Sequence, residues 1–279
     1  MRRLQLGRVE VIHIPGGFFR LDGGTMFGVV PKTLWQKQAE ADERNRVRLA
    51  CNCLLVRTPD ALVLVDSGFG ERLDERAKDI YGVEEGPSLR SSLAQANIAP
   101  EDIDLVVFTH LHFDHLAGSL YEQEGELKAI FPRAIHCIQR GELRDALAGR
   151  STMKSSYRPA DLRALEQQVS IKLLYGDSEL SPYISTFITG GHTEWHQGVM
   201  ITGSNQRLAY PGELVPTRAH LRSYWNMAYD IFPLQTIERK HQFISDAVRN
   251  EWIVAWDHDP DTPWNRLKKQ DDHIVAHNL

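Results

Sequence analysis

The sequence predicts one layered α/β domain that covers residues 1–279. Short β-rich segments occur in two successive halves of the chain, and segments with helical spacing lie between and after them. No stretch rich in proline, glycine or serine separates the halves, which argues against two independent domains. A length of 279 residues is compatible with one large α/β domain.

The β-rich segments of the first half begin at residues 9–14, a strand that a Pro-Gly-Gly turn at 15–17 should end. Residues 20–48 form a long irregular insertion, which is more typical of a functional loop, such as a lid over an active site, than of a plain connector. The runs 52–58 and 61–65 are joined by a Pro-Asp pair, which predicts a hairpin.

Helical segments appear in the rest of the chain. We predict helices at 89–97, 142–148 and 234–248, and surface helix and loop over 151–168. Residues 103–109 lack polar alternation, which indicates a buried strand that leads into a loop. The remaining predicted strands are 134–138, 171–175, 183–189, 199–203, 206–210 and, as the last one, 252–256.

Composition and charge exclude several classes of protein. Hydrophobic residues make up 42% of the chain and charged residues 25%, which is typical of a compact globular protein. The formal charge of −5 provides no basic excess for nucleic acid, so we expect a small-molecule substrate as partner. The apolar runs are far below the ~18 residues of a membrane span, and the N-terminus lacks the apolar core of a secretory signal. The lack of these segments, together with three cysteines that we expect to be buried free thiols, predicts a cytoplasmic protein without membrane contact. A homodimer is left open.

Four residues that can bind metal ions lie within six positions of one another. If the chain stays extended after the buried strand, His110 and His112 point to the same side. Asp114 and His115 follow where a turn into a helix is expected, so they can approach a second position nearby. Imidazole and carboxylate groups suit zinc, iron or manganese, and this number of donors indicates two divalent metal ions. The alternative is that Asp114 caps a helix and the histidines are ordinary loop residues.

This His-x-His-x-Asp-His string resembles the signature of the metallo-β-lactamase superfamily. The resemblance implies an αββα four-layer sandwich, in which two central mixed β-sheets are flanked by helices. Val65-Asp66-Ser67-Gly68 is similar to an early turn of the family whose aspartate, here Asp66, braces the metal-binding loop. The segments around His192 and His258 resemble the motifs that supply the third ligand of the first metal and the last ligand of the second.

One position departs from the family pattern. Where the family usually has a bridging aspartate, this chain has Glu213, which is longer by one methylene group. A longer carboxylate can still bridge two metals if it folds back; otherwise Glu213 is a solvated loop residue and only one metal binds tightly. The expected metal ligands are therefore His110, His112, Asp114, His115, His192, Glu213 and His258.

Further side chains are candidates for supporting roles. His196 either supports a metal ligand or is a structural histidine. Aromatic and methionine side chains in two expected loops could wall an apolar substrate pocket over the metals, or form a small core beneath those loops. These pocket candidates are Met26, Phe27, His220, Tyr224 and Trp225.

Other catalytic signatures are missing, because the sequence contains no Gly-x-Ser-x-Gly elbow, phosphate-binding loop or dinucleotide fingerprint. The resemblance is strongest to the lactonase and organophosphate hydrolase branch, which implies a dinuclear hydrolase that uses a metal-bound hydroxide on a small ester or lactone. Asp114 would orient the hydroxide and pass a proton to the leaving group. Zinc is the favoured metal, and iron and manganese stay open. The alternatives are an organophosphate or phosphodiester hydrolase, a metal-binding sensor without turnover, and an oxygen-handling di-iron enzyme.

Overall fold

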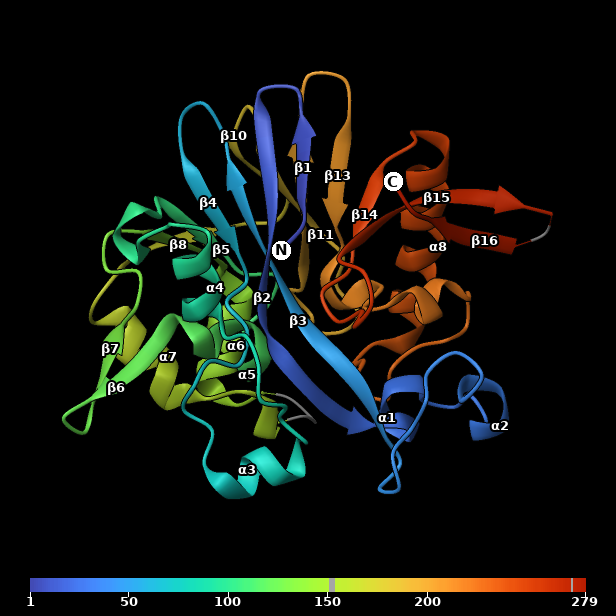
Figure 1. Cartoon of the computed structure of the whole chain (residues 1–279), viewed down its shortest axis with the longest axis horizontal. Coiled ribbons are helices and arrows are strands. Elements are labelled where there is room, and N and C mark those ends of the chain that lie inside the picture. The colour runs from blue at the N-terminus through green and yellow to red at the C-terminus, as the bar shows by residue number, and fades with distance from the viewer. Residues whose placement is uncertain (151–153, 272) are drawn as a thin grey trace.

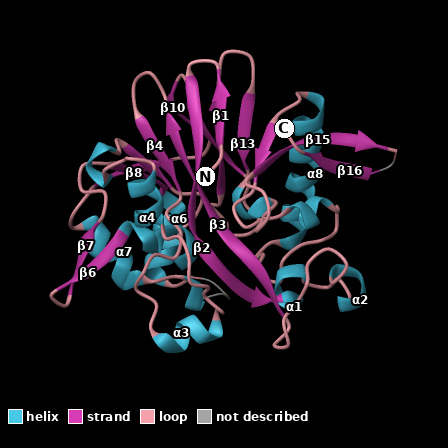
Figure 2. Cartoon of the chain, viewed as in Figure 1, coloured by secondary structure: helices cyan, strands magenta, loops and turns pink. Residues whose placement is uncertain are grey.

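Two mixed β-sheets form the middle of the molecule, and helices cover their outer faces (Figure 1). The computed structural model describes residues 1–150, 154–271 and 273–279. Helices α4, α6 and α7 lie on one side of the pair of sheets and α8 on the other, as the colouring by secondary structure also shows (Figure 2). The predicted αββα four-layer sandwich is therefore confirmed.

The first sheet joins antiparallel and parallel strands. β1 to β4 pair in antiparallel fashion, and β5, β8 and β9 continue the sheet in parallel with β4. In spatial order its strands are β1 (Arg3–Leu6), β2 (Val9–Asp22), β3 (Arg46–Arg57), β4 (Leu62–Val65), β5 (Leu105–Val107), β8 (Ile135–Gln139) and β9 (Ser170–Leu174).

The second sheet is antiparallel except for one parallel pair, β13 with β14. Its strands, in both spatial and chain order, are β10 (Ser178–Ser181), β11 (Ile184–Ile188), β12 (Gln197–Thr202), β13 (Arg207–Tyr210), β14 (Ile253–Ala255), β15 (Trp264–Gln270) and β16 (His273–His277). A separate two-stranded ribbon consists of β6 (Leu120–Gln123) and β7 (Glu126–Ala129).

The helices are mostly short. The α-helices are α1 (Gly23–Phe27), α2 (Lys32–Trp35), α3 (Glu75–Ile80), α4 (Leu89–Gln95), α5 (Phe113–Leu116), α6 (Arg140–Ala148), α7 (Pro159–Glu166) and α8 (Pro233–Arg249). Single turns of 3₁₀ helix are η1 (Pro100–Asp102), η2 (Ala117–Ser119), η3 (Lys154–Ser156), η4 (Gly212–Leu214) and η5 (Arg218–Leu221). The helices in the described parts of the chain are too short or too polar to span a bilayer.

Alternation along the strands builds three apolar layers between these elements. Val11 and Ile12 are adjacent in β2, yet Val11 packs between the two sheets and Ile12 packs toward the helices. Leu93 of α4 belongs to the layer with Ile12, and Phe243 of α8 covers the outer face of the second sheet. Burial of apolar surface on both faces of each sheet is the main force that holds the four layers together.

Most predicted elements are found, including the hairpin of β3 and β4, the buried strand β5 and the long helix α8. The predicted break at 15–17 is wrong, because β2 continues to Asp22. A register shift between Pro15 and Phe18 lets the strand pass a residue that cannot donate a backbone hydrogen bond. The irregular insertion accordingly shrinks from 20–48 to residues 23–45 and contains α1 and α2.

The second half contains more strands than predicted. Residues 252–256 are not the last strand, since β15 and β16 follow them and complete the second sheet. The last three residues of β15 are exposed, which hides the alternation expected of a half-buried strand. Of the predicted segment 151–168, residues 151–153 lie outside the described residues, and α7 forms the predicted helix.

Candidate metal centre

The seven predicted ligands lie in loops and short helical turns at one edge of the two sheets; Asp114 and His115 belong to α5, and Glu213 belongs to η4. His110 follows β5, His192 follows β11, Glu213 follows β13 and His258 follows β14. β11, β13 and β14 run in the same direction, because β11 and β13 both pair antiparallel with β12, and β14 is parallel to β13. The carboxyl ends of these strands therefore bring residues that are far apart in sequence to one place.

The first group of ligand atoms comes from His110, His112, His192 and Glu213, all of them buried. Oε2 of Glu213 lies 3.0 Å from Nε2 of His110 and 2.5 Å from Nε2 of His192. Nδ1 of His112 lies 3.1 Å from Nε2 of His192 and 3.9 Å from the same Glu213 oxygen. Three imidazole nitrogens thus face one carboxylate oxygen, which is the donor set of a tetrahedral metal site.

The second group consists of Asp114, His115 and His258, again with Glu213. Nε2 of His258 lies 3.7 Å from Oδ2 of Asp114 and 3.4 Å from Oε1 of Glu213. Nε2 of His115 lies 4.0 Å from Oδ2 of Asp114 and 3.9 Å from Oε2 of Glu213. In each group all ligand atoms lie within 4.8 Å of one another, which is close enough for one ion to contact them all.

Glu213 is shared between the two groups. Its Oε2 faces the first group and its Oε1 faces His258 of the second. The turn that carries it begins at Gly212, whose backbone has a positive φ of 55°. A Cβ atom at this position would lie 2.7 Å from Nε2 of His196, so only glycine fits there without a shift. With the turn in this position, the two oxygens of Glu213 reach both groups of ligand atoms despite the extra methylene.

Hydrogen bonds hold the imidazole rings in orientation. Nδ1 of His192 donates to Oδ1 of Asp230 at 3.1 Å, and Nδ1 of His258 donates to the carbonyl oxygen of Ala50 at 2.8 Å. Nδ1 of His115 donates to Oδ2 of Asp66 at 2.9 Å. Each of these bonds leaves Nε2 free to face the centre, which is the usual arrangement behind metal-binding histidines.

Asp66 contacts the loop as well as the ligand. Its Oδ1 accepts a hydrogen bond from the backbone N–H of Thr109 at 2.8 Å, and its Oδ2 accepts one from the hydroxyl of Thr109 at 2.9 Å. Oγ1 of Thr109 also lies 3.1 Å from Nδ1 of His110. The structure thus places Asp66 where it contacts one predicted ligand directly and another through Thr109.

Several buried polar atoms at this centre fit a bound cation. Among the described residues, Nε2 of His110, His115 and His258 and Oε2 of Glu213 have no hydrogen-bond partner. Both oxygens of Asp257, which precedes His258, are also unpartnered, and burial raises the pKa of Asp257 to about 7. Buried polar groups without partners are costly, whereas a divalent metal ion satisfies imidazole and carboxylate donors together.

Protons compete for the same atoms. Burial and neighbouring imidazoles hold the pKa of His110 and of His112 well below the usual value. Burial also opposes the charge on His115 and His258, but nearby carboxylates outweigh it and raise the pKa to about 9 for His115 and to about 10 for His258. A cation that binds to the second group must therefore displace protons.

Comparison with known proteins agrees with this geometry. The model of the metallo-beta-lactamase superfamily matches residues 46–262. The chain belongs to this superfamily. A probable metal-dependent hydrolase from Staphylococcus aureus has the same fold with a TM-score of 0.88 and 31% identity, covering 99% of this chain and 98% of that one. The dizinc quorum-quenching lactonase AidC superposes with a TM-score of 0.80 at 20% identity, covering 100% and 97%, and shows the fold alone.

Curated relatives of this superfamily member include lactonases. The N-acyl homoserine lactonase of Bacillus cereus is 25% identical over 167 residues, which is 56% of this chain and 60% of the relative. The N-acyl homoserine lactonase AttM of Rhizobium radiobacter is 25% identical over 61% of this chain and 63% of the relative. The chain thus matches these relatives over about three fifths of their length.

His196 lies behind Glu213 and outside both groups of ligand atoms. Its Nε2 accepts a hydrogen bond from the backbone N–H of Glu213 at 3.2 Å, and its Nδ1 lies 2.5 Å from Oγ1 of Thr189. Burial lowers the pKa of His196 well below the usual value, which agrees with its role as an acceptor. The structure therefore places His196 as a support of the turn that carries Glu213.

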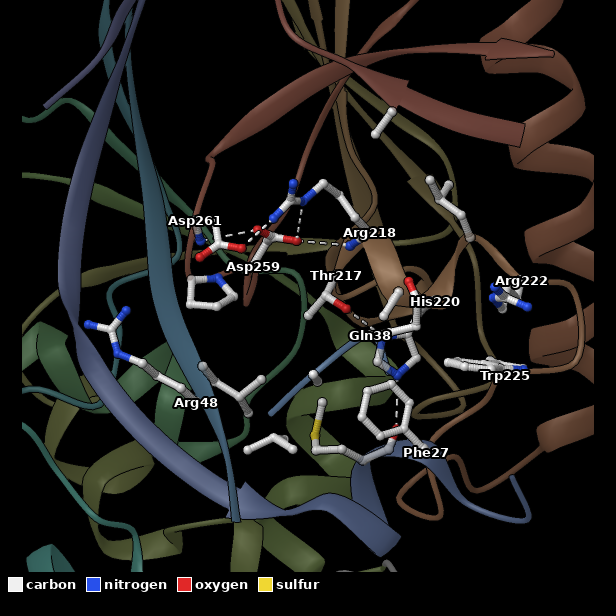
Figure 3. Close-up of a pocket in the computed structure, with 18 of the residues that line it drawn as sticks. Phe27, Gln38, Arg48, Thr217, Arg218, His220, Arg222, Trp225, Asp259 and Asp261 are labelled. Carbon is white, nitrogen blue, oxygen red and sulfur yellow. Dashed lines mark hydrogen bonds and ion pairs between the residues drawn. The ribbon is translucent and has the colours of Figure 1, made fainter. Parts of the chain in front are cut away.

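The five predicted pocket residues line one cavity of about 1340 Å³, between the insertion, η5 and β16 (Figure 3). The described residues that line it include none of the seven predicted ligands, so the cavity lies beside the metal centre and not over it. It is also not the expected apolar pocket, because charged side chains from η5 and the following loop enter it. Arg218 reaches into it and pairs with Asp259 and Asp261.

His220 lines this cavity, but its ring nitrogens are engaged by the protein. Nε2 donates to the carbonyl oxygen of Met26 at 2.9 Å, and Nδ1 lies 2.8 Å from Oγ1 of Thr217. The ring stacks on Phe27 with centroids 4.9 Å apart. His220 therefore fastens the insertion to the body of the protein, whereas Tyr224, 70% exposed, lies at the rim of the cavity.

The insertion predicted as a lid packs on residues 222–232. The carbonyl oxygen of Thr25 accepts a hydrogen bond from the N–H of Ala228 at 2.8 Å, and its hydroxyl lies 2.7 Å from that of Tyr229. The same segment carries Asp230, the partner of His192, which sequence reasoning missed. Asp230 lies in an aromatic stretch without ligand spacing, so no sequence signal identified it.

Proposed function

We propose that this protein is a metal-dependent hydrolase that cleaves a small lactone or ester. The observation that supports this most strongly is the Glu213 carboxylate, which is shared by two buried groups of histidine and aspartate ligand atoms. Membership of the superfamily and the resemblance to N-acyl homoserine lactonases favour a lactone as substrate.

Two divalent ions are the proposed cofactors, with zinc favoured. His110, His112 and His192 would hold the first ion, Asp114, His115 and His258 the second, and Glu213 would bridge them. The hard nitrogen and oxygen donors suit iron and manganese too. Ions bound there would supply Lewis-acid polarisation of the substrate carbonyl and nucleophilic water near neutral pH.

The chain's own residues then position and protonate the substrate. Oδ2 of Asp114 lies 3.7 Å from Nε2 of His258, and we assign Asp114 the transfer of a proton from the nucleophilic water to the leaving alkoxide oxygen. Apolar rings exclude water around the centre, among them Phe19, whose ring centroid lies 5.6 Å from that of His258.

A panel of substrates tests this proposal. Protein loaded with zinc is assayed on lactones, carboxyl esters, thioesters, β-lactams and phosphotriesters, with His110→Ala as the matched inactive variant. We expect lactone or ester hydrolysis that disappears in His110→Ala. Preference for phosphotriesters would favour the organophosphate alternative, and the absence of any turnover by a metal-loaded protein would favour a sensor.

A further inference from the structure

Glu142 of α6 is a buried carboxylate that contacts three separate segments of the chain. It is 1% exposed. Its Oε1 accepts hydrogen bonds from the backbone N–H of Leu111 at 3.1 Å and from the hydroxyl of Tyr157 at 2.9 Å. Its Oε2 accepts a hydrogen bond from the hydroxyl of Thr193 at 2.7 Å. All three donors point at one charged group, so the carboxylate is well satisfied although it is buried.

These donors lie next to the histidines of the first group. Leu111 stands between His110 and His112, and Thr193 follows His192 directly. The ring of Tyr157 lies against that of His112, with centroids 4.8 Å apart. One side chain from a helix outside the centre thus contacts both loops that supply the three histidines.

We infer that Glu142 is a positioning residue that sets the distance between the His110–His112 loop and the His192 loop and thereby strengthens binding of the first metal ion. This rests on the proposed metal function of the cluster. The second group is braced differently, because Asp66 and not Glu142 holds His115. Loss of Glu142 should therefore weaken the first position selectively.

The same helix offers a matched control. Asp145 is also buried on α6, and its Oδ2 accepts a hydrogen bond from Nε1 of Trp195 at 3.2 Å. It makes no hydrogen bond to the His110–His112 loop among the described residues, and Asp145→Asn keeps an oxygen that can still accept from Trp195. This variant therefore removes a buried negative charge from α6 without cutting a link to either histidine loop. If loss of a buried negative charge on α6 were responsible, Asp145→Asn would weaken metal binding as much as Glu142→Leu.

Zinc affinity is the test, measured by competition with a chromophoric chelator. A His258→Ala background isolates the first position, and a His192→Ala background isolates the second. We expect Glu142→Leu to lower zinc affinity of the first position by about 10- to 100-fold and to leave the second within about threefold. Glu142→Gln should keep most of the affinity, because its carbonyl can still accept from Leu111 and Tyr157.

Thr193→Val cuts only the link to the His192 loop and should lower first-position affinity by a smaller factor; it decides the matter if Glu142→Leu does not fold. The inference would be overturned if zinc affinity of the first position were unchanged in Glu142→Leu or, where that variant does not fold, in Thr193→Val. The proposed function would stand in that case. An equal loss at both positions, or an equal loss in Asp145→Asn, would also overturn the inference. If the unmodified chain bound no zinc, the proposed function would fail with it.

Discussion

The side chain at position 213 differs from the usual aspartate of its family by one methylene group, and the structure accommodates the difference. The Glu213 carboxylate presents Oε2 to one group of ligand atoms and Oε1 to the other, while His196 holds the backbone of the turn. Because Glu213 is only 5% exposed and its longer side chain reaches both groups, the alternative that it is a solvated loop residue does not hold.

Two substitutions of Glu213 test whether its carboxylate bridges the two groups: one removes the carboxylate and the other shortens the side chain. Glu213→Ala removes a ligand from both groups, so we expect the metal content to fall below one ion per chain and hydrolysis to fall by about 100-fold or more. Glu213→Asp restores the residue that is usual in the family and should keep or raise hydrolysis. Metal analysis and steady-state kinetics check both variants, and unchanged metal content and activity in Glu213→Ala would rule out the bridging role.

His136 gives the metal-free protein a pH dependence that is independent of the centre. Burial lowers the pKa of His136 to about 4 from 6.5, so the folded state binds its proton less readily than the unfolded state. The stability it contributes is therefore present above pH 6.5 and is lost as the pH falls toward 4. Between pH 7 and pH 5 the unmodified chain should therefore lose about 2 kcal/mol more of its free energy of unfolding than the His136→Phe variant loses.

Urea unfolding of chelator-treated protein at pH 7 and pH 5 checks this value. His241→Phe, which changes an exposed histidine to the same residue, is the matched control. If His136→Phe lost as much stability on acidification as the unmodified chain, the buried neutral state of His136 would be refuted.

At the scale of elements, sequence pattern predicts the strands and helices that carry continuous apolar runs. β5 and β4 are short, buried and β-branched, and the apolar periodicity of α8 is clear in the sequence. The sequence pattern does not predict β15, because the exposed lysines near its end interrupt the alternation of apolar and polar residues. It also does not predict the bulge of β2, because a Pro-Gly-Gly sequence is typical of a turn that ends a strand. Local signals fail where tertiary pairing decides the outcome.

The contact between α6 and the His192 loop is an element-scale prediction. A Cβ atom at Gly141 would lie 2.2 Å from the ring of Trp195, so Gly141→Ala must push the loop away from the helix. We expect the free energy of unfolding to fall by about 1–3 kcal/mol in urea titrations. Gly86→Ala is the control, since nothing lies within 4 Å of its added Cβ. Equal stability of Gly141→Ala and Gly86→Ala would contradict this packing.

At the scale of the whole molecule, the two sheets assemble a centre that the sequence reveals only in part. The string from His110 to His115 is local, so its spacing alone indicates metal ligands. His192, Glu213 and His258 are distant in sequence and were identified through resemblance to the superfamily. Glu142 and Asp230 remained hidden, because their hydrogen bonds depend on helix and loop packing that no sequence spacing encodes.

The metal content of the protein tests the central claim most directly. Protein purified without added metal is analysed by inductively coupled plasma mass spectrometry, before and after dialysis against a chelator. Two divalent ions per chain before dialysis, lost together with thermal stability after it, are the predicted result. Only trace amounts of zinc, iron, manganese and cobalt, in a protein whose stability the chelator leaves unchanged, would contradict the account.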